Sequence, residues 1–330
     1  MIAACRDGVV VLGIGSHVPD RVLTNDEIAT MVETSDEWIA QRTGIHERRI
    51  AAPGDSSASL GAEAARLALA SAGVGADELD LIVAATASPD YYFPATASLI
   101  GNTIGAVDVA GYDLSAACTG FIYALAQGYA QIASGLADTV LVVGTEVFSR
   151  LLDWRDRSTC ILFGDGAGAV VLGRSEGPGG LRGFEMGSDG SGGPLLSVAA
   201  AGNAAFGDEG PYVKMNGPEV YKFATRVVVE SAERCLHAAG MTIAEVDLFI
   251  PHQANRRIID HAARRLGIDE GKVFSNVDRY GNTSAGSIPI GLDEAWRQGR
   301  IDRGDIVLMV GFGGGLAWGS ALLEWTKERA

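Results

Sequence analysis

A single thiol stands at the junction of two apolar stretches. Residues 113–125 read DLSAACTGFIYAL, and the immediate neighbours of Cys118 in this stretch are alanine, threonine and glycine. A thiol at the start of a helix lies at the positive end of the helix dipole, beside free N–H groups that favour the thiolate and can bind an oxyanion. On this stretch alone, a covalent nucleophile and a small buried hydrophobe are equally good interpretations.

Three other segments carry polar groups suited to chemistry. His252, in PHQANRRII, follows the apolar run VDLFI, and open α/β sheets bind ligands just past such strand ends. A histidine there can donate a hydrogen bond or shuttle a proton, or it can simply cap the loop. Asn282, in RYGNTSAGSIPIGL, is either an amide donor or an Asx-turn residue. The stretch GFGGGLAWGS at 311–320 offers accessible backbone N–H groups, but it lacks the spacing of a phosphate-binding P-loop.

Composition narrows the classes of protein to consider. The 330 residues carry a net charge of −15, which disfavours a general nucleic-acid binder and a protein that binds anionic membranes. The four cysteines are scattered without a CxxC motif, so neither a metal site nor a disulfide framework is predicted. The N-terminus does not resemble a signal peptide, and no apolar run approaches 18 residues. We expect a cytoplasmic protein with reduced thiols.

The elements that must position these residues repeat along the chain. Residues 64–83 (AARLALASAGVGADELDLIV) match residues 231–250 (SAERCLHAAGMTIAEVDLFI), and residues 137–146 match residues 304–313, both at an offset of 167 residues. The short β-branched runs in these segments do not alternate with polar residues, which is typical of strands buried on both faces. Helical patterns between such strands indicate an α/β protein with helices on both sides of each sheet.

We therefore predict two copies of one α/β unit, stacked as five layers in the order α/β/α/β/α. The N-terminal half, residues 1–174, carries the cysteine, and the C-terminal half, residues 175–330, carries the histidine and the asparagine. At the offset of 167, Cys118 corresponds to Ala285, inside the turn that contains Asn282. We expect the two related turns to face each other and to build one site from both halves.

Taken together, these segments resemble the β-ketoacyl-[acyl-carrier-protein] synthase III family of the thiolase-like superfamily over essentially the whole chain. The resemblance rests on six motifs: TSDEWIAQRTGI at 34–45, DLSAACTGF around Cys118, ILFGDGAGA at 161–169, PHQAN at 251–255, GNTSAGSIP at 281–289 and GFGGGLAWGS at 311–320. It implies a thiolase-like fold and an acyltransferase that initiates type II fatty-acid synthesis.

The resemblance also implies the course of the reaction. An acyl-CoA primer, acetyl-CoA or a similar short one, would acylate the cysteine. Malonyl-acyl carrier protein would then lose CO2 and attack the thioester, giving 3-oxoacyl-acyl carrier protein and CoA. No cofactor is implied, because the CoA thioesters are substrates.

The resemblance also implies roles for individual residues. Cys118 would be the nucleophile. His252 and Asn282 would donate hydrogen bonds to the malonyl thioester carbonyl. The backbone N–H groups of Cys118 and Gly314 would form the oxyanion hole, and Phe312 would lie against the histidine and the asparagine.

Residues that contact the two substrates are implied in the same way. Three match the CoA site, where an indole suits adenine and guanidinium groups suit phosphates: Trp38, Arg42 and Arg157. Four arginines with a spacing of eight between pairs would dock the acidic carrier protein: Arg256, Arg257, Arg264 and Arg265. A buried aromatic and a solvated basic surface are the ordinary alternatives for these residues. Phe93 matches a position that closes the acyl pocket of a partner subunit, so a homodimer is expected.

Other functions remain open at this point. A homologue from secondary metabolism that primes a polyketide, or that transfers the acyl group to another acceptor, would carry the same motifs. A thiolase is disfavoured because it needs a second catalytic cysteine, which the GFGGG loop does not supply. A non-catalytic partner subunit is disfavoured because the cysteine, the histidine and the asparagine are all present.

Overall fold

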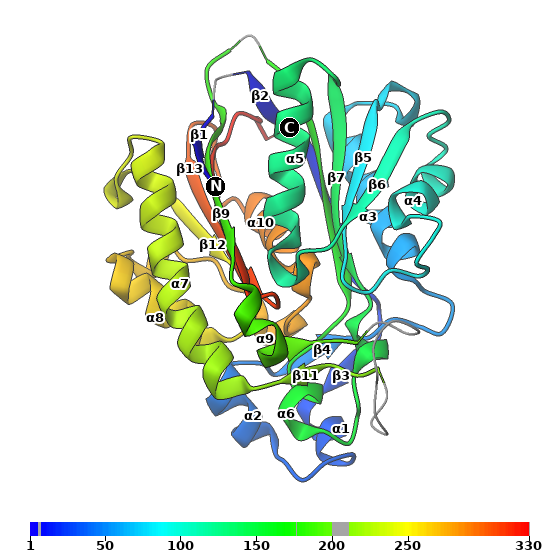
Figure 1. Cartoon of the computed structure of the whole chain (residues 1–330), viewed down its shortest axis with the longest axis vertical. Coiled ribbons are helices and arrows are strands. Elements are labelled where there is room, and N and C mark those ends of the chain that lie inside the picture. The colour runs from blue at the N-terminus through cyan, green and yellow to red at the C-terminus, as the bar shows by residue number, and fades with distance from the viewer. Residues whose placement is uncertain (6–7, 176, 200–210, 330) are drawn as a thin grey trace.

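Two mixed five-stranded sheets form the frame of the part of the chain that the computed structural model describes, residues 1–5, 8–175, 177–199 and 211–329 (Figure 1). The strands of the first sheet, in spatial order, are β2 (Val9–His17), β8 (Gly166–Arg174), β7 (Thr139–Glu146), β5 (Leu81–Ala85) and β6 (Ala110–Leu114). Those of the second are β1 (Ile2–Ala4), β9 (Gly180–Ser188), β14 (Ala317–Glu324), β13 (Ile306–Gly313) and β12 (Leu248–Pro251).

Helices cover both faces of both sheets. The outer face of the first sheet packs on α3 (Ser57–Ala72) and α4 (Thr96–Ile104), and the outer layer of the second consists of α7 (Gly217–Ala238) and α8 (Arg256–Leu266). The shared middle layer holds α5 (Gly120–Ser134) and α10 (Ser287–Arg297), which lie between the sheets in Figure 1. The predicted five layers are therefore confirmed. No helix among the residues described is long and apolar enough to cross a membrane.

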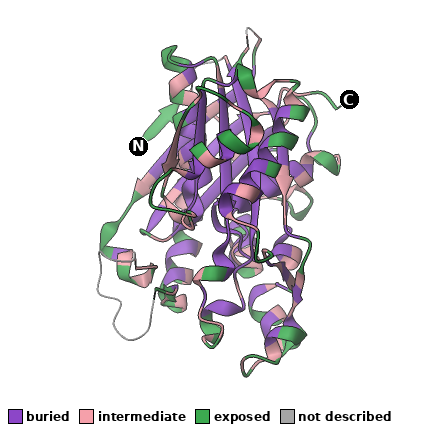
Figure 2. Cartoon of the chain, turned by 90° about the vertical axis from the view of Figure 1, so that its right-hand side faces the viewer, coloured by how far each residue is buried: buried purple, intermediate pink, exposed green. Residues whose placement is uncertain are grey.

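Smaller elements gather at one end of the sheets, at the bottom of Figure 1. They are β3 (Val22–Thr24), β4 (Glu47–Arg49), β10 (Leu196–Ser197), β11 (Lys214–Met215), α1 (Asn25–Ala29), α2 (Asp36–Thr43), α6 (Arg157–Cys160) and α9 (Val277–Tyr280). Apart from the edge strands β1 and β6, the strands above them are largely buried, and most exposed residues lie on the outer helices and loops (Figure 2). The polar ends of buried strands therefore meet this group of loops and short helices.

Four consecutive strands of each sheet, β2-β8-β7-β5 and β9-β14-β13-β12, share one order and one set of strand directions. In each, one inner strand (β7 or β13) pairs antiparallel with one neighbour and parallel with the other, and β7 and β13 are 167 residues apart. This match supports our proposal that residues 1–174 and 175–330 are copies of one unit. The copies differ at the edges, because β1 pairs with β9 in the second sheet and β6 has no strand counterpart among the described residues of that sheet.

The middle layer requires glycine where the two halves touch. A Cβ on Gly144 of β7 would lie 2.2 Å from the backbone carbonyl oxygen of Ala285. At the equivalent place on β13, a Cβ on Gly311 would lie 2.9 Å from Oγ1 of Thr119. Without a side chain at these positions, the turn that starts α10 contacts the backbone of the first sheet, and the turn that starts α5 contacts the backbone of the second.

We predict that Gly144→Ala destabilises the protein much more than Gly54→Ala. The new methyl group meets a backbone oxygen that cannot move aside, and overpacking of this kind costs about 1–3 kcal/mol. A Cβ on Gly54 would meet no atom of the described residues within 4 Å, so this position serves as the matched control. Urea unfolding measures both free energies; equal stabilities of the two variants would contradict the packing argument.

Candidate active site

Cys118 lies in a short 3-10 turn, Ala117–Thr119, that leads directly into α5. Ala117 adopts a left-handed conformation with φ of 46°, which redirects the chain from β6 into the helix. The turn presses against β13, where a Cβ on Gly313 would lie 2.9 Å from the Cys118 nitrogen. The Cys118 side chain is only 4% exposed, and it lines two adjoining cavities of about 500 and 140 Å³.

The structure brings His252 and Asn282 to the smaller of these cavities. His252 follows β12, and its backbone N–H donates to the carbonyl of Val310 at 2.8 Å. The Phe312 ring meets the imidazole edge-on, with 5.2 Å between ring centroids, and Nδ1 of His252 is buried without a hydrogen-bond partner among the residues described. The predicted packing of Phe312 on the histidine therefore agrees with the geometry.

Asn282 is held so that its amide nitrogen is available as a donor. Its backbone N–H donates to the Leu162 carbonyl at 2.8 Å, and its carbonyl accepts from Gly164 at 3.0 Å. The side-chain Oδ1 accepts the backbone N–H of Ser284 at 2.8 Å. Asn282 and Cys118 line the same cavity. Because the oxygen is already occupied, the nitrogen is the atom turned toward the site.

The start of α5 favours a thiolate at Cys118, but burial of the thiol acts in the opposite direction. Burial raises the pKa of the thiol to about 12; the nearby Glu146 carboxylate acts in the same direction, and hydrogen bonds from Ser284 and Asn282 oppose the shift. Burial also lowers the pKa of His252 to about 3. Desolvation outweighs the helix dipole here, so the site holds a thiol and a neutral imidazole at neutral pH.

The three residues predicted to bind CoA lie together at the group of short helices. The guanidinium of Arg42 lies 4.5 Å from the centroid of the Trp38 ring, and that of Arg157 lies 4.7 Å from it. Both arginines are exposed and the indole is half-buried. Arg157 also donates to the carbonyl of Glu33 at 2.7 Å, which ties α6 to the segment before α2. The arrangement offers stacking surface and positive charge in one place.

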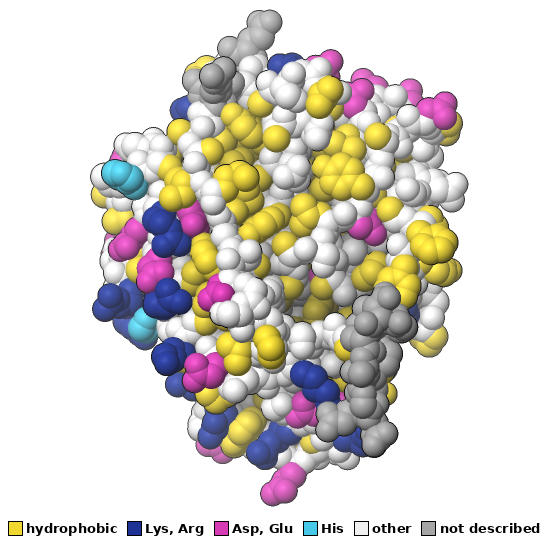
Figure 3. All heavy atoms as spheres, in the orientation of Figure 1, with side chains coloured by type: hydrophobic (Ala, Val, Ile, Leu, Met, Phe, Trp, Pro, Cys, Tyr) yellow, Lys and Arg dark blue, Asp and Glu magenta, His cyan; other side chains and the backbone are white. Residues whose placement is uncertain are grey.

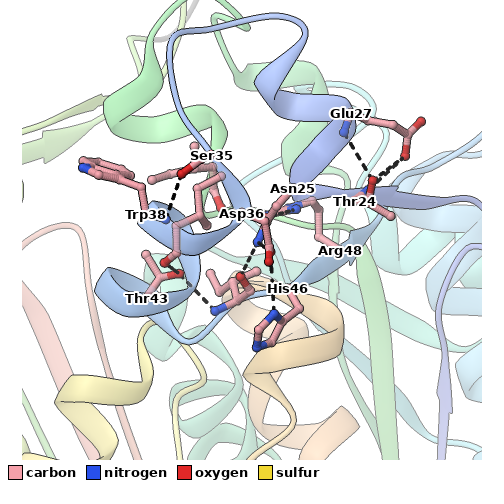
Figure 4. A network of polar contacts seen from close by, with 12 residues as sticks. Thr24, Asn25, Glu27, Ser35, Asp36, Trp38, Thr43, His46 and Arg48 are labelled. Atoms are coloured by element: carbon pink, nitrogen blue, oxygen red, sulfur yellow. Dashed lines mark hydrogen bonds and ion pairs between the residues drawn. The ribbon is translucent and has the colours of Figure 1, made fainter.

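A buried polar network fixes α2 and hence Trp38 (Figure 4). The Asn25 side chain donates to Asp36 at 2.8 Å and to the Ile45 carbonyl at 2.7 Å, and it accepts from Arg48 at 2.9 Å. Arg48 is fully buried, and burial lowers its pKa to about 10. The sequence analysis did not single out Arg48, because an arginine among charged neighbours looks like a surface residue.

The other predicted contact residues lie apart from Cys118. Phe93 is 86% exposed and does not line either cavity next to the cysteine in this single chain. Arg256 pairs with Asp260 at 2.7 Å, and Arg257 lies over the Tyr221 ring, which borders the smaller cavity. Basic side chains gather on the side of the molecule where α7 and α8 lie, at the left of Figure 3.

The wall of the larger cavity includes aromatic residues that sequence reasoning missed. Phe148 and Phe163 stack with 4.8 Å between ring centroids, and Tyr123 lines the same cavity. Phe163 falls within the ILFGDGAGA motif, which offered a signal for its position. Phe148 and Tyr123 gave no such signal in the sequence, because each is one apolar residue among many in its segment.

This fold, with a buried cysteine at the start of a central helix and a histidine and an asparagine beside it, defines a thiolase-like condensing enzyme. Residues 112–190 match the family model for 3-oxoacyl-[acyl-carrier-protein (ACP)] synthase III, and residues 236–325 match the model for its C-terminal part. The chain is 51% identical over 326 residues to the β-ketoacyl-[acyl-carrier-protein] synthase III of Desulfitobacterium hafniense, a match covering 97% of this chain and 98% of that protein.

Solved structures agree with this assignment. The 3-oxoacyl-[acyl-carrier-protein] synthase III of Aquifex aeolicus VF5 superposes with a TM-score of 0.92 at 46% identity, covering 96% of this chain and 100% of that one. The priming β-ketosynthase of the R1128 polyketide pathway gives 0.93 at 38% identity, covering 99% of each chain. The chain belongs to the β-ketoacyl-[acyl-carrier-protein] synthase III family, and it is an acyltransferase.

We predict that alkylation of Cys118 by iodoacetamide is slow at neutral pH and accelerates with pH. A thiol pKa of about 12 leaves little thiolate at pH 7, and the thiolate population rises about tenfold per pH unit well below the pKa. Intact-mass kinetics between pH 7 and pH 9 measure the rate, with Cys118→Ala reporting labelling at other cysteines. A rate independent of pH in this range would contradict the neutral resting thiol.

Proposed function

We propose that the chain joins an acyl-CoA primer to malonyl-acyl carrier protein through an acyl thioester on Cys118, as the initiating condensation of type II fatty-acid synthesis. The observation that carries the proposal is the convergence of Cys118, His252 and Asn282 on one buried cavity. The curated relatives are synthases III of about half-identical sequence, whereas the polyketide-priming neighbour is 38% identical. Fatty-acid synthesis is therefore favoured over polyketide priming.

Acylation is the first half-reaction. The Cys118 sulfur forms a bond to the acyl carbon of the primer, the bond from that carbon to the CoA sulfur breaks, and the thiol proton leaves with CoA. The backbone N–H groups of Cys118 and Gly314 hold the oxyanion that forms on the way. The cavity of about 500 Å³ beside Cys118 receives the acyl group, acetyl or a similar short chain. Trp38, Arg42 and Arg157 bind the nucleotide end of CoA.

Condensation is the second half-reaction. Malonyl-acyl carrier protein loses CO2, and the enolate that results attacks the acyl carbon on Cys118 to give the 3-oxoacyl product and the free cysteine. His252 and Asn282 donate hydrogen bonds to the thioester oxygen as it becomes an enolate. A neutral imidazole and an amide nitrogen with its partner oxygen occupied both suit this role. Phe312 covers the histidine and limits the access of water.

Two partner surfaces complete the proposal. The basic surface of α8 lies just after His252 and suits the acidic carrier protein, while Phe93 with the exposed Tyr91 suits a second copy of the chain. β6 is one of the two edge strands of the first sheet, and an edge strand presents unpaired backbone groups to a partner. Hydrophobic side chains also spread over the face shown in Figure 3. The homodimer places Phe93 against the partner's acyl cavity.

We predict that Asn282→Ala separates the two half-reactions. The variant keeps the thiol and the oxyanion hole, so acetyl-CoA still adds an acetyl group to Cys118. Loss of one preorganised donor slows condensation by about 10²–10³-fold. Mass spectrometry of the protein measures acylation, and mass spectrometry of the carrier protein measures 3-oxoacyl product. Cys118→Ala is the control that loses both. Absence of any 3-oxoacyl product from the wild-type chain would refute the proposed function.

We predict that reversing charge on α8 weakens use of the carrier protein alone. In Arg264→Glu/Arg265→Glu, two exposed positive charges become negative. The KM for malonyl-acyl carrier protein rises by about tenfold or more at low salt, because each rim charge acts through long-range attraction. The KM for acyl-CoA stays unchanged. Arg66→Glu, on the opposite outer layer, is the matched control; equal effects of the two changes would argue against docking at α8.

A further inference from the structure

Two buried polar side chains, Asn25 and Arg48, support the helix that carries Trp38. Asn25 is 1% exposed and Arg48 is 0% exposed. Asn25 begins α1 and Arg48 lies in β4, so neither belongs to the helices that carry the three residues proposed to bind CoA. The indole of Trp38 lies on the side of α2 away from both side chains (Figure 4). They can therefore act on a bound CoA molecule only through the segments that they hold.

Asn25 holds both ends of α2. Its amide nitrogen carries two hydrogens, and both are used. One is donated to Oδ1 of Asp36, the first residue of the helix, at 2.8 Å. The other is donated to the carbonyl of Ile45, just beyond the end of the helix, at 2.7 Å. Trp38 and Arg42 lie between these two points, so one buried amide fixes the helix that carries both of them.

Arg48 joins this arrangement to α6. Its Nη1 donates to Oδ1 of Asn25 at 2.9 Å and to the carbonyl of Leu23 at 3.1 Å. Its Nη2 donates to the carbonyl of Ile161, which caps the end of α6, at 2.7 Å. Because α6 has only four residues and begins at Arg157, a contact at its end also determines where Arg157 lies.

The guanidinium of Arg48 is suited to this connection by its shape. Its planar fork of N–H groups meets oxygens from three separate segments, whereas a lysine ammonium is a compact point charge without that fixed geometry. The bond from Arg48 also orients the amide of Asn25. With Oδ1 occupied by the guanidinium, the amide nitrogen is the atom that faces Asp36.

We propose that Asn25 and Arg48 are positioning residues for the nucleotide end of acyl-CoA. Together they determine how α2 and α6 lie relative to each other, and with them the indole and the two guanidinium groups proposed to bind CoA. The inference rests on the proposed function. Neither residue is among the described residues that line the cavities next to Cys118. Loss of the network therefore weakens capture of a CoA thioester and leaves acyl transfer to the sulfur unchanged.

The test compares two primers, acetyl-CoA and acetyl-pantetheine, which lacks the nucleotide. Single-turnover acylation of Cys118 is followed by intact mass over a range of primer concentrations in Arg48→Lys, Asn25→Asp and Trp38→Ala. Asn25→Asp keeps an oxygen that accepts from Arg48 and loses both amide hydrogens. We expect each variant to need roughly tenfold more acetyl-CoA for half-saturation, the scale of one lost hydrogen bond, with the saturated rate within about twofold of wild type. Acylation by acetyl-pantetheine stays unchanged.

Arg49→Lys is the matched control. Arg49 is the next residue on the same strand, and its guanidinium donates to the carbonyls of Pro19 and Asp20 instead, at 3.3 and 3.4 Å. We expect this variant to use both primers as the wild type does.

The exchange Asn25→Asp/Asp36→Asn tests the contact itself. The donating amide moves to position 36 and the accepting oxygen to position 25, so the hydrogen bond between the two side chains returns. We expect the double variant to need less acetyl-CoA for half-saturation than Asn25→Asp alone, because residues in contact are not additive.

Unchanged half-saturation by acetyl-CoA in folded Arg48→Lys and Asn25→Asp would overturn the inference. An equal loss with acetyl-pantetheine, which a general effect on the fold would cause, or the same loss in Arg49→Lys, would overturn it too. If Arg48→Lys does not fold, the exchange variant compared with Asn25→Asp decides. Wild-type use of acetyl-CoA by Trp38→Ala would overturn both the inference and the nucleotide site on which it rests. A wild-type chain that forms no acyl adduct would instead overturn the proposed function.

Discussion

The direct contact between two turns in the middle layer is the constraint on which the rest of the structure depends. The start of α5 and the start of α10 meet between the sheets, where a Cβ on Gly120 would lie 3.5 Å from that of Ala285. Gly144 and Gly311 allow each turn to reach the backbone of the opposite sheet. Because protein interiors are close-packed, this contact also fixes how far apart the two sheets lie. The position of Cys118 follows from that spacing.

Contact between the two turns also explains why a site needs both halves. The cysteine comes from the first half, whereas the histidine and the asparagine follow the strand β12 and the helix α9 of the second. Loops at the carboxyl ends of both sheets open toward the same group of short helices (Figure 1). The fold thus brings together residues more than a hundred positions apart in sequence without a long loop to carry them.

Sequence reasoning predicted the features that are set by pattern and failed at those set by packing. The repeat predicted the layers and placed Cys118 opposite the Asn282 turn, since strand periodicity and glycine positions are local properties. The effect of burial on the Cys118 thiol could not be predicted, because its pKa depends on how segments distant in sequence exclude water from the sulfur. Arg48 and Glu146 were missed for the same reason: each is a charged residue whose complete burial is visible only in three dimensions.

An uncharged cysteine and histidine suit the proposed decarboxylation better than an ion pair would. A cationic imidazole would bind the malonyl carboxylate in the ground state and would oppose its loss as CO2, in which that charge moves away. Neutral donors instead interact weakly with the thioester carbonyl and more strongly as negative charge develops on its oxygen. Burial, which lowers the pKa of His252 to about 3, keeps the imidazole neutral throughout the physiological range. The same desolvation that removes the thiolate from the resting site therefore favours the transition state of the second half-reaction.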